Sequence, residues 1–425
     1  MFRNPGGYPW RIAMVAAMAL GALAAPAARG AGIEREMRVA QEKLYLSGLK
    51  SYSPDAKRSG LAVRPAPPRK ATSSASRPAV APATRAADVS LELARLKTEV
   101  ASLKEALGVQ EELATASERE APRLQITSWL DLDFAHETRK GRPASFDAEH
   151  VYYIFSSQVS PEWKAYSEIE FERGAELKGG GGGDGEILVE QAWANYNRSP
   201  YLGLRLGKFL TPYGVWNRNH WDPITETSAQ PFTFRNALIP VNQTGVSASG
   251  SVQRGRAEID YVGFVTNGRG AKPHADDANG NKAVGFDLSA GKPRRWKVGL
   301  SAYRNKNDAD GDRLENIGVL WWTFDRGRWH AQAEWLRHGG DRSIDAFYLQ
   351  PSYRLDRNWK LVGRLDTWDP DRTSPASLRQ TELLLGVNRR FADSVLGKLE
   401  LIRHEDDAPG GASYNRIGTS LSILF

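Results

Sequence analysis

Beyond residue 123, apolar and polar positions alternate along the chain. The alternation runs in segments of about ten residues, and turn-forming residues separate one segment from the next. In the first segment, for example, Asp131 and Asp133 flank Leu132. A period of two places successive side chains on opposite faces of a β-strand. We count about sixteen such segments, so the pattern predicts an all-β, antiparallel domain over residues 122–425.

The connections between these segments alternate in length. The short connections lie at 160–161, 197–200, 253–255, 291–293, 325–327, 356–358 and 391–393. The longer, polar connections lie at 137–147, 175–185, 210–241, 268–281, 305–314, 369–377 and 406–412. Bacterial outer-membrane barrels have an even number of strands, short periplasmic turns and longer outer loops. The alternation therefore predicts a transmembrane β-barrel of about sixteen strands with both chain ends in the periplasm.

Aromatic residues favour the same architecture. Trp163, Trp296, Trp329 and Trp359 each follow a short connection within a few residues, as expected for an aromatic girdle at a membrane interface. The alternative is that they are core residues of a soluble β-sandwich. The chain ends with Phe425 at the tip of a strand, which is similar to the terminal signal that barrel-assembly machinery recognises.

The first 118 residues follow other patterns. Residues 1–31 have the basic start, apolar stretch and small-residue exit of a secretory signal peptide. We expect a short periplasmic helix over 32–50. Residues 51–87 are rich in Pro, Ala, Lys and Arg, so they predict a disordered basic linker.

A heptad pattern follows the linker, over residues 88–118. Its apolar positions, spaced alternately by four and three residues, are Val89, Leu93, Leu96, Val100, Leu103 and Leu107. A helix with so few heptads is only marginally stable by itself. The apolar stripe therefore favours packing against partner helices, in a short periplasmic coiled coil that precedes the barrel. A single amphipathic helix packed on its own domain remains the alternative.

Composition then narrows the functional classes. The chain has 425 residues, no cysteine, and a formal net charge of +7. Without cysteine there is no disulfide, thiolate nucleophile or cysteine-bound metal. The positive charge is weak evidence for a nucleic-acid partner, because many Lys and Arg residues lie in the N-terminal region and at turns, and we expect no such partner. After the signal segment, no apolar stretch approaches the roughly 18 residues of a spanning helix.

Several motifs within the predicted barrel are similar to those of a known family. They are LGLRLGKFLTPYGVW at 202–216, YLQPSYRL at 348–355 followed by LVGRLD at 361–366, TNG at 266–268 and LGVN at 385–388. Together they resemble the phosphate-selective porin O and P family over residues 120–425. The resemblance implies a trimeric, sixteen-stranded porin with an anion path lined by Arg and Lys. Some members of the family also carry a periplasmic coiled coil.

The alternation also predicts which charged side chains face the barrel interior. The inward acids are Asp131, Asp133, Glu168, Glu170, Glu172, Glu258, Asp260, Asp287, Glu334, Asp366, Glu382 and Glu400. The inward bases are Lys164, Arg205, Lys297, Arg354, Lys360, Arg364, Arg390, Lys398 and Arg416. The segment 186–197 fits neither face. Mixed signs favour general diffusion of small hydrophilic solutes, and a preference for phosphate or polyanions is the alternative.

The connection at 210–241 is the longest one. It is rich in proline and aromatic residues, too apolar for a solvated tail, and long irregular loops are usually functional or disordered. We therefore expect it to fold into the barrel and narrow it, with an outer lid as the alternative. The candidate pore-lining and constriction residues are Arg205, Lys208, Arg218, His220, Asp222, Arg235, Arg354, Arg364 and Asp366.

No catalytic or metal-binding motif stands out. The glycine-rich stretch 179–185 lacks the Lys-Ser/Thr of a phosphate-binding P-loop. The Asp-rich stretch 308–312 lacks the twelfth-position Glu of an EF-hand, so a solvated loop is favoured over weak divalent binding. The seven histidines show no paired metal spacing. We therefore expect no enzyme activity, no cofactor and no metal.

The sequence as a whole favours a porin in the outer membrane of a Gram-negative bacterium. Such a protein would be a homotrimer in contact with lipid and lipopolysaccharide, with its N-terminal helix in the periplasm. A structural anchor is the alternative function. In that case the linker and coiled coil would contact the cell wall, and the barrel would only hold the chain in the membrane.

Overall fold

The computed structural model describes residues 124–425, apart from 175–184, 237, 271, 278 and 341–342. The strands are β1 (Leu124–Glu137), β2 (Ser145–Gln158), β3 (Trp163–Glu172), β4 (Ile187–Ser199), β5 (Leu202–Leu210), β6 (Asn242–Arg254), β7 (Ala257–Thr266), β8 (Ala283–Lys292), β9 (Trp296–Asn307), β10 (Arg313–Arg326), β11 (Trp329–Gly340), β12 (Ile344–Arg354), β13 (Trp359–Asp369), β14 (Gln380–Ala392), β15 (Val395–Asp406) and β16 (Tyr414–Leu424). The described helical turns are α4 (Phe232–Arg235) and η1 (Asp308–Asp310). The signal peptide, helix, linker and coiled coil predicted before residue 119 lie outside the described residues.

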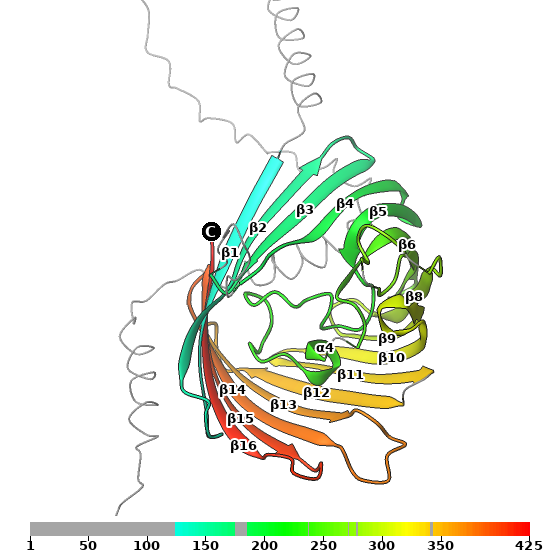
Figure 1. Ribbon diagram of the computed structural model, residues 1–425. Coiled ribbons are helices and arrows are strands. Elements are labelled where there is room, and N and C mark those ends of the chain that lie inside the picture. The colour runs from blue at the N-terminus through cyan, green and yellow to red at the C-terminus, as the bar shows by residue number, and fades with distance from the viewer. Residues whose placement is uncertain (1–123, 175–184, 237, 271, 278, 341–342) are drawn as a thin grey trace, which may run out of the picture. The chain divides into compact units, whose positions relative to one another are not determined.

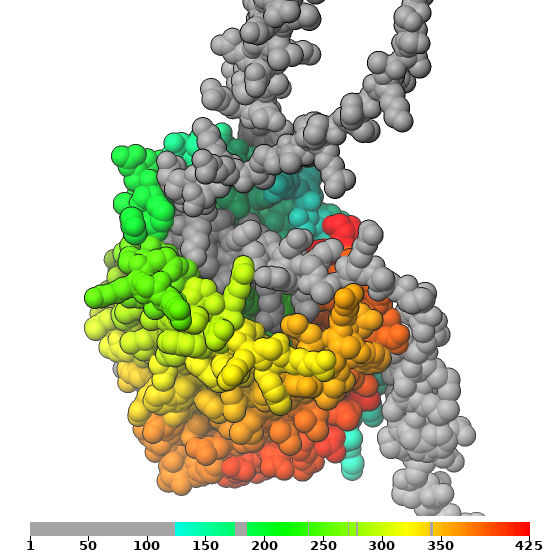
Figure 2. Space-filling model, turned by 180° about the vertical axis from the view of Figure 1, so that it is seen from behind, coloured from blue at the N-terminus to red at the C-terminus, as the bar shows by residue number. Residues whose placement is uncertain are grey.

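The strands form one closed antiparallel barrel. Each strand pairs with the next along the chain, and β1 pairs with β16 to close the sheet (Figure 1). At this seam, Ser128 and Phe425 exchange two backbone hydrogen bonds of 3.0 and 2.8 Å. From behind, the outer wall runs without interruption from the green strands through yellow and orange to red (Figure 2). The predicted sixteen-stranded antiparallel barrel is confirmed.

The barrel wall is polar inside and apolar outside. On β14 and β15, the paired residues Leu385 and Leu401 are 60% and 55% exposed on the outer face, whereas Glu400, which precedes Leu401, is 3% exposed. All the predicted inward acids are buried except Glu172, which is half-buried. A soluble protein would bury the apolar side chains and expose the acidic ones. The outer surface is therefore matched to lipid, and the inner surface to water.

The segment that fitted neither face contains a β-bulge. Glu190 and Gln191 of β4 are adjacent in sequence, yet both are buried inside the barrel. The pairing of β3 with β4 shifts between Glu168 and Ile169, which leaves one extra residue on β4. A bulge resets the alternation by one position, so residues before and after it follow opposite patterns. It also turns the Glu190 carboxylate into the lumen.

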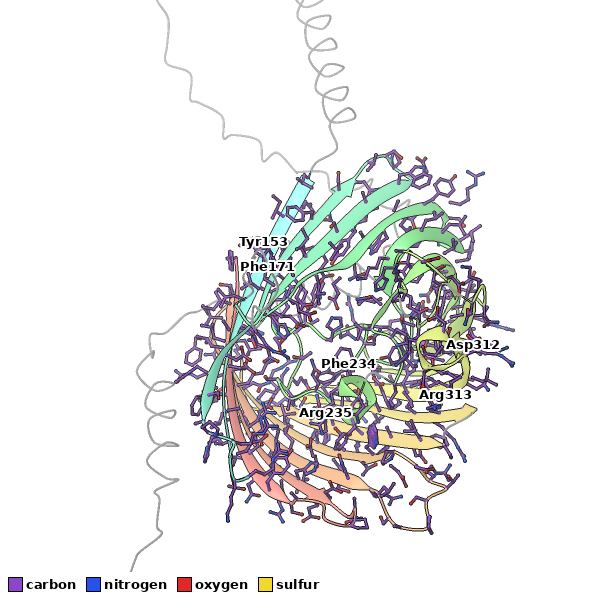
Figure 3. All side chains as sticks on the ribbon, in the orientation of Figure 1. Tyr153, Phe171, Phe234, Arg235, Asp312 and Arg313 are labelled. Carbon is purple, nitrogen blue, oxygen red and sulfur yellow. The ribbon has the colours of Figure 1, made fainter. Side chains whose placement is uncertain are left out.

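Aromatic side chains cover parts of the outer face. The four tryptophans of the predicted girdle lie at or near the start of β3, β9, β11 and β13, and each is at least 36% exposed. Tyr153 of β2 and Phe171 of β3 lie edge to face with ring centroids 5.9 Å apart (Figure 3). The closed barrel excludes the sandwich alternative. Among the described residues, no helix is long and apolar enough to cross a membrane.

Candidate functional site: a loop inside the barrel

The long connection between β5 and β6 lies within the barrel. We call residues 211–241 the lumen loop. Its base is closed by a 2.8 Å hydrogen bond from the Thr211 amide to the Val241 carbonyl, and Asn217 donates to the same two residues' carbonyls. Its single helical turn, α4, places Phe234 and Arg235 inside the barrel (Figures 1 and 3). The prediction that this segment folds inward is confirmed, and an outer lid is excluded.

Carboxylates of the wall hold the main chain of the lumen loop. Glu334 of β11 accepts hydrogen bonds of 2.6 Å from the amides of both Val215 and Trp216. Glu400 of β15 accepts bonds of 2.6 and 3.1 Å from the amides of residues 228 and 229. Asp366 of β13 accepts a 3.0 Å bond from the Phe232 amide. Such charge-assisted bonds are stronger than neutral ones, and they satisfy amides that an irregular buried loop would otherwise leave unpaired.

A glycine permits the first of these contacts. Gly214 adopts a φ of 57°, and a Cβ atom added there would lie 2.5 Å from a carboxylate oxygen of Glu334. Any side chain at this position would therefore be strained and would push the carboxylate away. The TPYGVW sequence is thus what lets the loop turn onto β11.

Basic side chains of the wall hold the same loop from other strands. Arg364 of β13 is 1% exposed and donates to the Thr227 hydroxyl at 2.9 Å and to the Ala229 carbonyl at 2.6 Å. Lys398 of β15 donates to the Thr225 hydroxyl at 3.0 Å. These contacts lie on the side of the barrel that also carries the carboxylate contacts, so the loop is held there by both signs of charge.

The loop's own charged residues reach the remaining parts of the wall. Arg218 pairs with Asp287 of β8 and lies 4.9 Å above the Trp321 ring. Arg235 pairs with Glu382 of β14 at 2.8 Å, and His220 lies 3.4 Å from Glu190 of β4. Among the described residues, side-chain contacts join the loop to eleven of the sixteen strands. It therefore crosses the lumen rather than lining one side of it.

The nine candidate residues fall into different places. Six bind the lumen loop to the wall, and these are Arg218, His220, Asp222, Arg235, Arg364 and Asp366. Arg218 also borders open space beside the loop, and Arg205 lies on the inner wall, 4.2 Å above the Trp193 ring. Arg354 is exposed at the end of the barrel where the short turns lie. Lys208 is set apart from the others, because by register it shares the outer face of β5 with Leu206.

Sequence reasoning missed several residues that position the loop. Glu334, Glu400 and Lys398 were predicted to face inward, but nothing in the sequence paired them with the loop. Glu190 was hidden by the bulge. Glu226 of the loop, which pairs with Lys360 of β13 at 3.2 Å, carried no signal beyond its charge.

Open space remains between the lumen loop and one side of the wall. One cavity, of about 200 Å³, is bordered by loop residues such as Trp216 and Arg218 and by wall residues such as Lys297 and Gln332. A smaller one, of about 40 Å³, shares Arg218 and Lys297 and adds Arg205. A third, of about 20 Å³, lies at the short-turn end. The first two share lining residues, so they follow one side of the lumen.

One of the loop contacts is expected to depend on pH. Burial favours neutral His220, but the neighbouring Glu190 carboxylate outweighs it and raises the pKa of His220 from its ordinary 6.5 to about 9. A raised pKa means that the folded protein favours the charged form. The resulting stabilisation is complete below about pH 6.5 and is lost as the pH rises through about 9.

We therefore expect single-channel current noise from loop motion to rise between pH 7 and pH 10. A His220→Gln variant should be noisy throughout this range and lose the pH dependence, whereas a His274→Gln variant, altered in an outer loop, should keep it. Equal noise profiles for wild type and His220→Gln would contradict this assignment.

Solved structures of outer-membrane porins share this architecture. The chain is similar to an anion-selective porin from Comamonas acidovorans (TM-score 0.56, 12% identity), which is covered completely by 72% of this chain. It is also similar to OmpF of Salmonella typhi in complex with daunomycin (0.55, 11%) and to the outer membrane channel DcaP of Acinetobacter baumannii (0.51, 12%). For both, 72% of this chain covers 98% of the solved chain. At these identities the likeness concerns the fold, which is that of a porin barrel.

The family match is more specific. Residues 124–327, which include β1 to β10 and the lumen loop, match the family described as phosphate-selective porin O and P. The family resemblance predicted from the motifs is confirmed for this part of the chain. An uncharacterized protein of Aquifex aeolicus (strain VF5) is 28% identical over 223 residues, which is 47% of this chain. The match spans half the length of that curated relative. The family match and the barrel fold together support an outer-membrane channel.

Proposed function

We propose that the protein is a porin through which small hydrophilic solutes and ions diffuse passively, with a preference for anions. The solutes pass between the lumen loop and the wall formed by β5 to β11. The observation that carries this proposal is the pair of adjoining cavities on that side, which share Arg218 and Lys297. Passage through a bore of this kind is governed by its width and by the fixed charge that lines it.

Basic residues outnumber acids when the three cavities are taken together. The two adjoining cavities are bordered by three basic and four acidic residues, and the cavity at the short-turn end adds four basic residues and one acid. Several of the acids are already paired: Asp287 accepts from Ser301 and Trp321 besides Arg218, and Asp260 pairs with Lys297. Arginine suits oxyanions because its guanidinium group offers a planar fork of N–H donors and remains positively charged. The names of the matched family and of the Comamonas porin, phosphate-selective and anion-selective, support the same direction.

The test of this proposal is ion selectivity in planar bilayers. In a KCl gradient, the reversal potential of the wild-type channel should indicate that chloride permeates better than potassium. Arg218→Gln and Arg205→Gln should each shift the reversal potential toward cation preference, because each removes a positive charge beside the cavities. Addition of phosphate should lower the chloride current if the same groups bind phosphate.

Arg337→Gln is the matched control. This substitution removes the same charge at an exposed position on β11, between the outward-facing Trp335 and the end of the strand. Its reversal potential should equal that of the wild type. A cation-selective wild type, or unchanged selectivity in both lumen variants, would overturn the proposed anion path.

We also infer the partners and location that go with this function. The protein would be a homotrimer in the outer membrane, surrounded by lipid and lipopolysaccharide, after assembly through its terminal Phe425. The alternative of a cell-wall anchor has no support in the family match or the fold, and its linker and coiled coil lie outside the described residues.

A further inference from the structure

Acidic and imidazole side chains converge where the lumen loop meets β1 and β2. One oxygen of Asp131, one ring nitrogen of His150 and one oxygen of Asp222 all lie within 4.8 Å of one another. Two further acids, Asp133 and Glu149, form an overlapping group with Asp131. The three groups of the first set come from β1, β2 and the loop, so whatever they hold would join the loop to the wall.

The buried carboxylates at this point are incompletely paired. Asp131 is 0% exposed, and its Oδ1 accepts from the hydroxyls of Ser420 and Ser422 at 2.8 and 2.5 Å. Its Oδ2 is also buried, yet it has no hydrogen-bond partner among the described residues, and the same holds for Oδ1 of the neighbouring Asp133. A buried carboxylate oxygen without a partner is costly unless a cation compensates it.

His150 is oriented as a metal ligand would be. Its Nε2 lies 3.4 Å from the Glu170 carboxylate, and its Nδ1 lies 3.5 Å from Oδ2 of Asp222. Metal-binding histidines commonly donate one ring N–H to a carboxylate and direct the other nitrogen to the metal. Two ligands of a tetrahedral zinc ion, each about 2.1 Å from it, lie about 3.4 Å apart. The separation of Nδ1 and Oδ2 agrees with this geometry.

The second oxygen of Asp222 is held separately. Lys398 of β15 lies 3.4 Å from Oδ1 of Asp222, so Oδ2 is the oxygen directed at His150. Lys398 thus holds one oxygen of Asp222 and leaves the other directed at the position that His150 also faces.

We propose that Asp131, His150 and Asp222 bind one divalent transition-metal ion such as Zn²⁺, and that this ion fastens the lumen loop to the β1–β2 wall. Mixed imidazole and carboxylate ligands suit zinc better than calcium or magnesium, which favour oxygen ligands throughout. Glu170 orients His150 and is a positioning residue rather than a ligand. The ligands are far apart in sequence, so no paired spacing could reveal them.

The test is direct metal binding to the full-length protein in detergent. The protein is prepared without a histidine tag, stripped with EDTA and titrated with Zn²⁺ by calorimetry. We expect one zinc per chain, and at least a tenfold loss of affinity in each of Asp131→Asn, His150→Gln and Asp222→Asn. Glu170→Gln should lower the affinity by about 10- to 100-fold, as removal of such an orienting partner does.

Two matched variants control for general effects. His404→Gln removes another buried histidine that contacts a carboxylate, Glu382, at 2.9 Å, and Glu315→Gln removes a buried inward acid of β10. Both should bind zinc like the wild type. Zinc-edge X-ray absorption on the wild type, which needs no variant to fold, should show a nitrogen and oxygen shell containing one imidazole.

Several results would overturn the assignment. These are the absence of stoichiometric zinc in the wild type, a shell with two or more imidazoles, or zinc affinity that is unchanged in Asp222→Asn. Calcium binding that persists in His150→Gln would place an oxygen-only site at Asp131, Asp133 and Glu149 instead. None of these readouts depends on conductance, so failure here leaves the proposed anion path untouched, and the reverse also holds.

Discussion

Replacing residues 213–239 with a short Gly-Ser linker is expected to raise the single-channel conductance several-fold. The lumen loop crosses the barrel and contacts eleven of its strands, so it narrows the bore. A sixteen-stranded barrel without such a loop encloses an aqueous channel. The linker needs little length, because the Thr211 amide and the Val241 carbonyl are already 2.8 Å apart at the base of the loop.

The barrel should remain assembled after this deletion. The wall acids that now accept loop amides, among them Glu334 and Glu400, would become hydrated rather than buried without partners, so the desolvation cost disappears together with the contacts. Their exposure, together with the loss of Arg218 and Arg235, should also shift selectivity toward cations.

Conductance and reversal potential in planar bilayers measure both effects. A matched deletion in the outer connection between β13 and β14, at 371–377, removes polar loop residues without opening the lumen, and it should conduct like the wild type. If the lumen-loop deletion also conducted like the wild type, the constriction would lie elsewhere in the barrel.

The barrel was predictable from the sequence because its determinants are local. Alternation around Leu132 assigns Asp131 and Asp133 to the inside, and the structure places both there. In a strand, alternate side chains point to opposite faces, so assigning one residue to the inside assigns all the others. The short turns indicate where each strand begins. The pattern left the segment 186–197 unassigned, because a bulge at Glu190 shifts the period there by one residue. A single extra residue has no composition signal of its own, so such a shift is visible only in the pairing.

The contacts of the lumen loop were not predictable in the same way. The prolines and aromatic residues between 210 and 241 indicated that this segment would be buried, but they could not indicate which wall residues would meet it. The Val215 amide and Glu334 are 119 residues apart in the chain, and the Phe232 amide and Asp366 are 134 apart. Such pairs depend on the barrel's closure and on the path of the loop. Inward charges could therefore be identified, while their division into loop contacts and bore-lining groups could not.

Arg364→Met is expected to lower the free energy of unfolding by about 3 kcal/mol and to release the loop from β13. The guanidinium has no exposed surface and donates to Thr227 and to the Ala229 carbonyl, and its Nε lies 3.6 Å from Asp366. Removing one member of a buried charged pair leaves the other uncompensated, which typically costs about 3–5 kcal/mol. Equilibrium denaturation in detergent micelles measures this loss, and larger current fluctuations would report the loosened loop.

A double-mutant cycle separates the lost pair from the lost hydrogen bonds. In Arg364→Met combined with Asp366→Asn, no buried charge is left unpaired, so part of the lost stability should return. Arg354→Met, the same change at an exposed position on the neighbouring strand β12, should alter stability by less than about 0.5 kcal/mol. Should Arg364→Met behave like Arg354→Met, the loop would be held chiefly by the carboxylates of β11 and β15. In that case Glu334 and Glu400, rather than the arginine, would set the width of the channel.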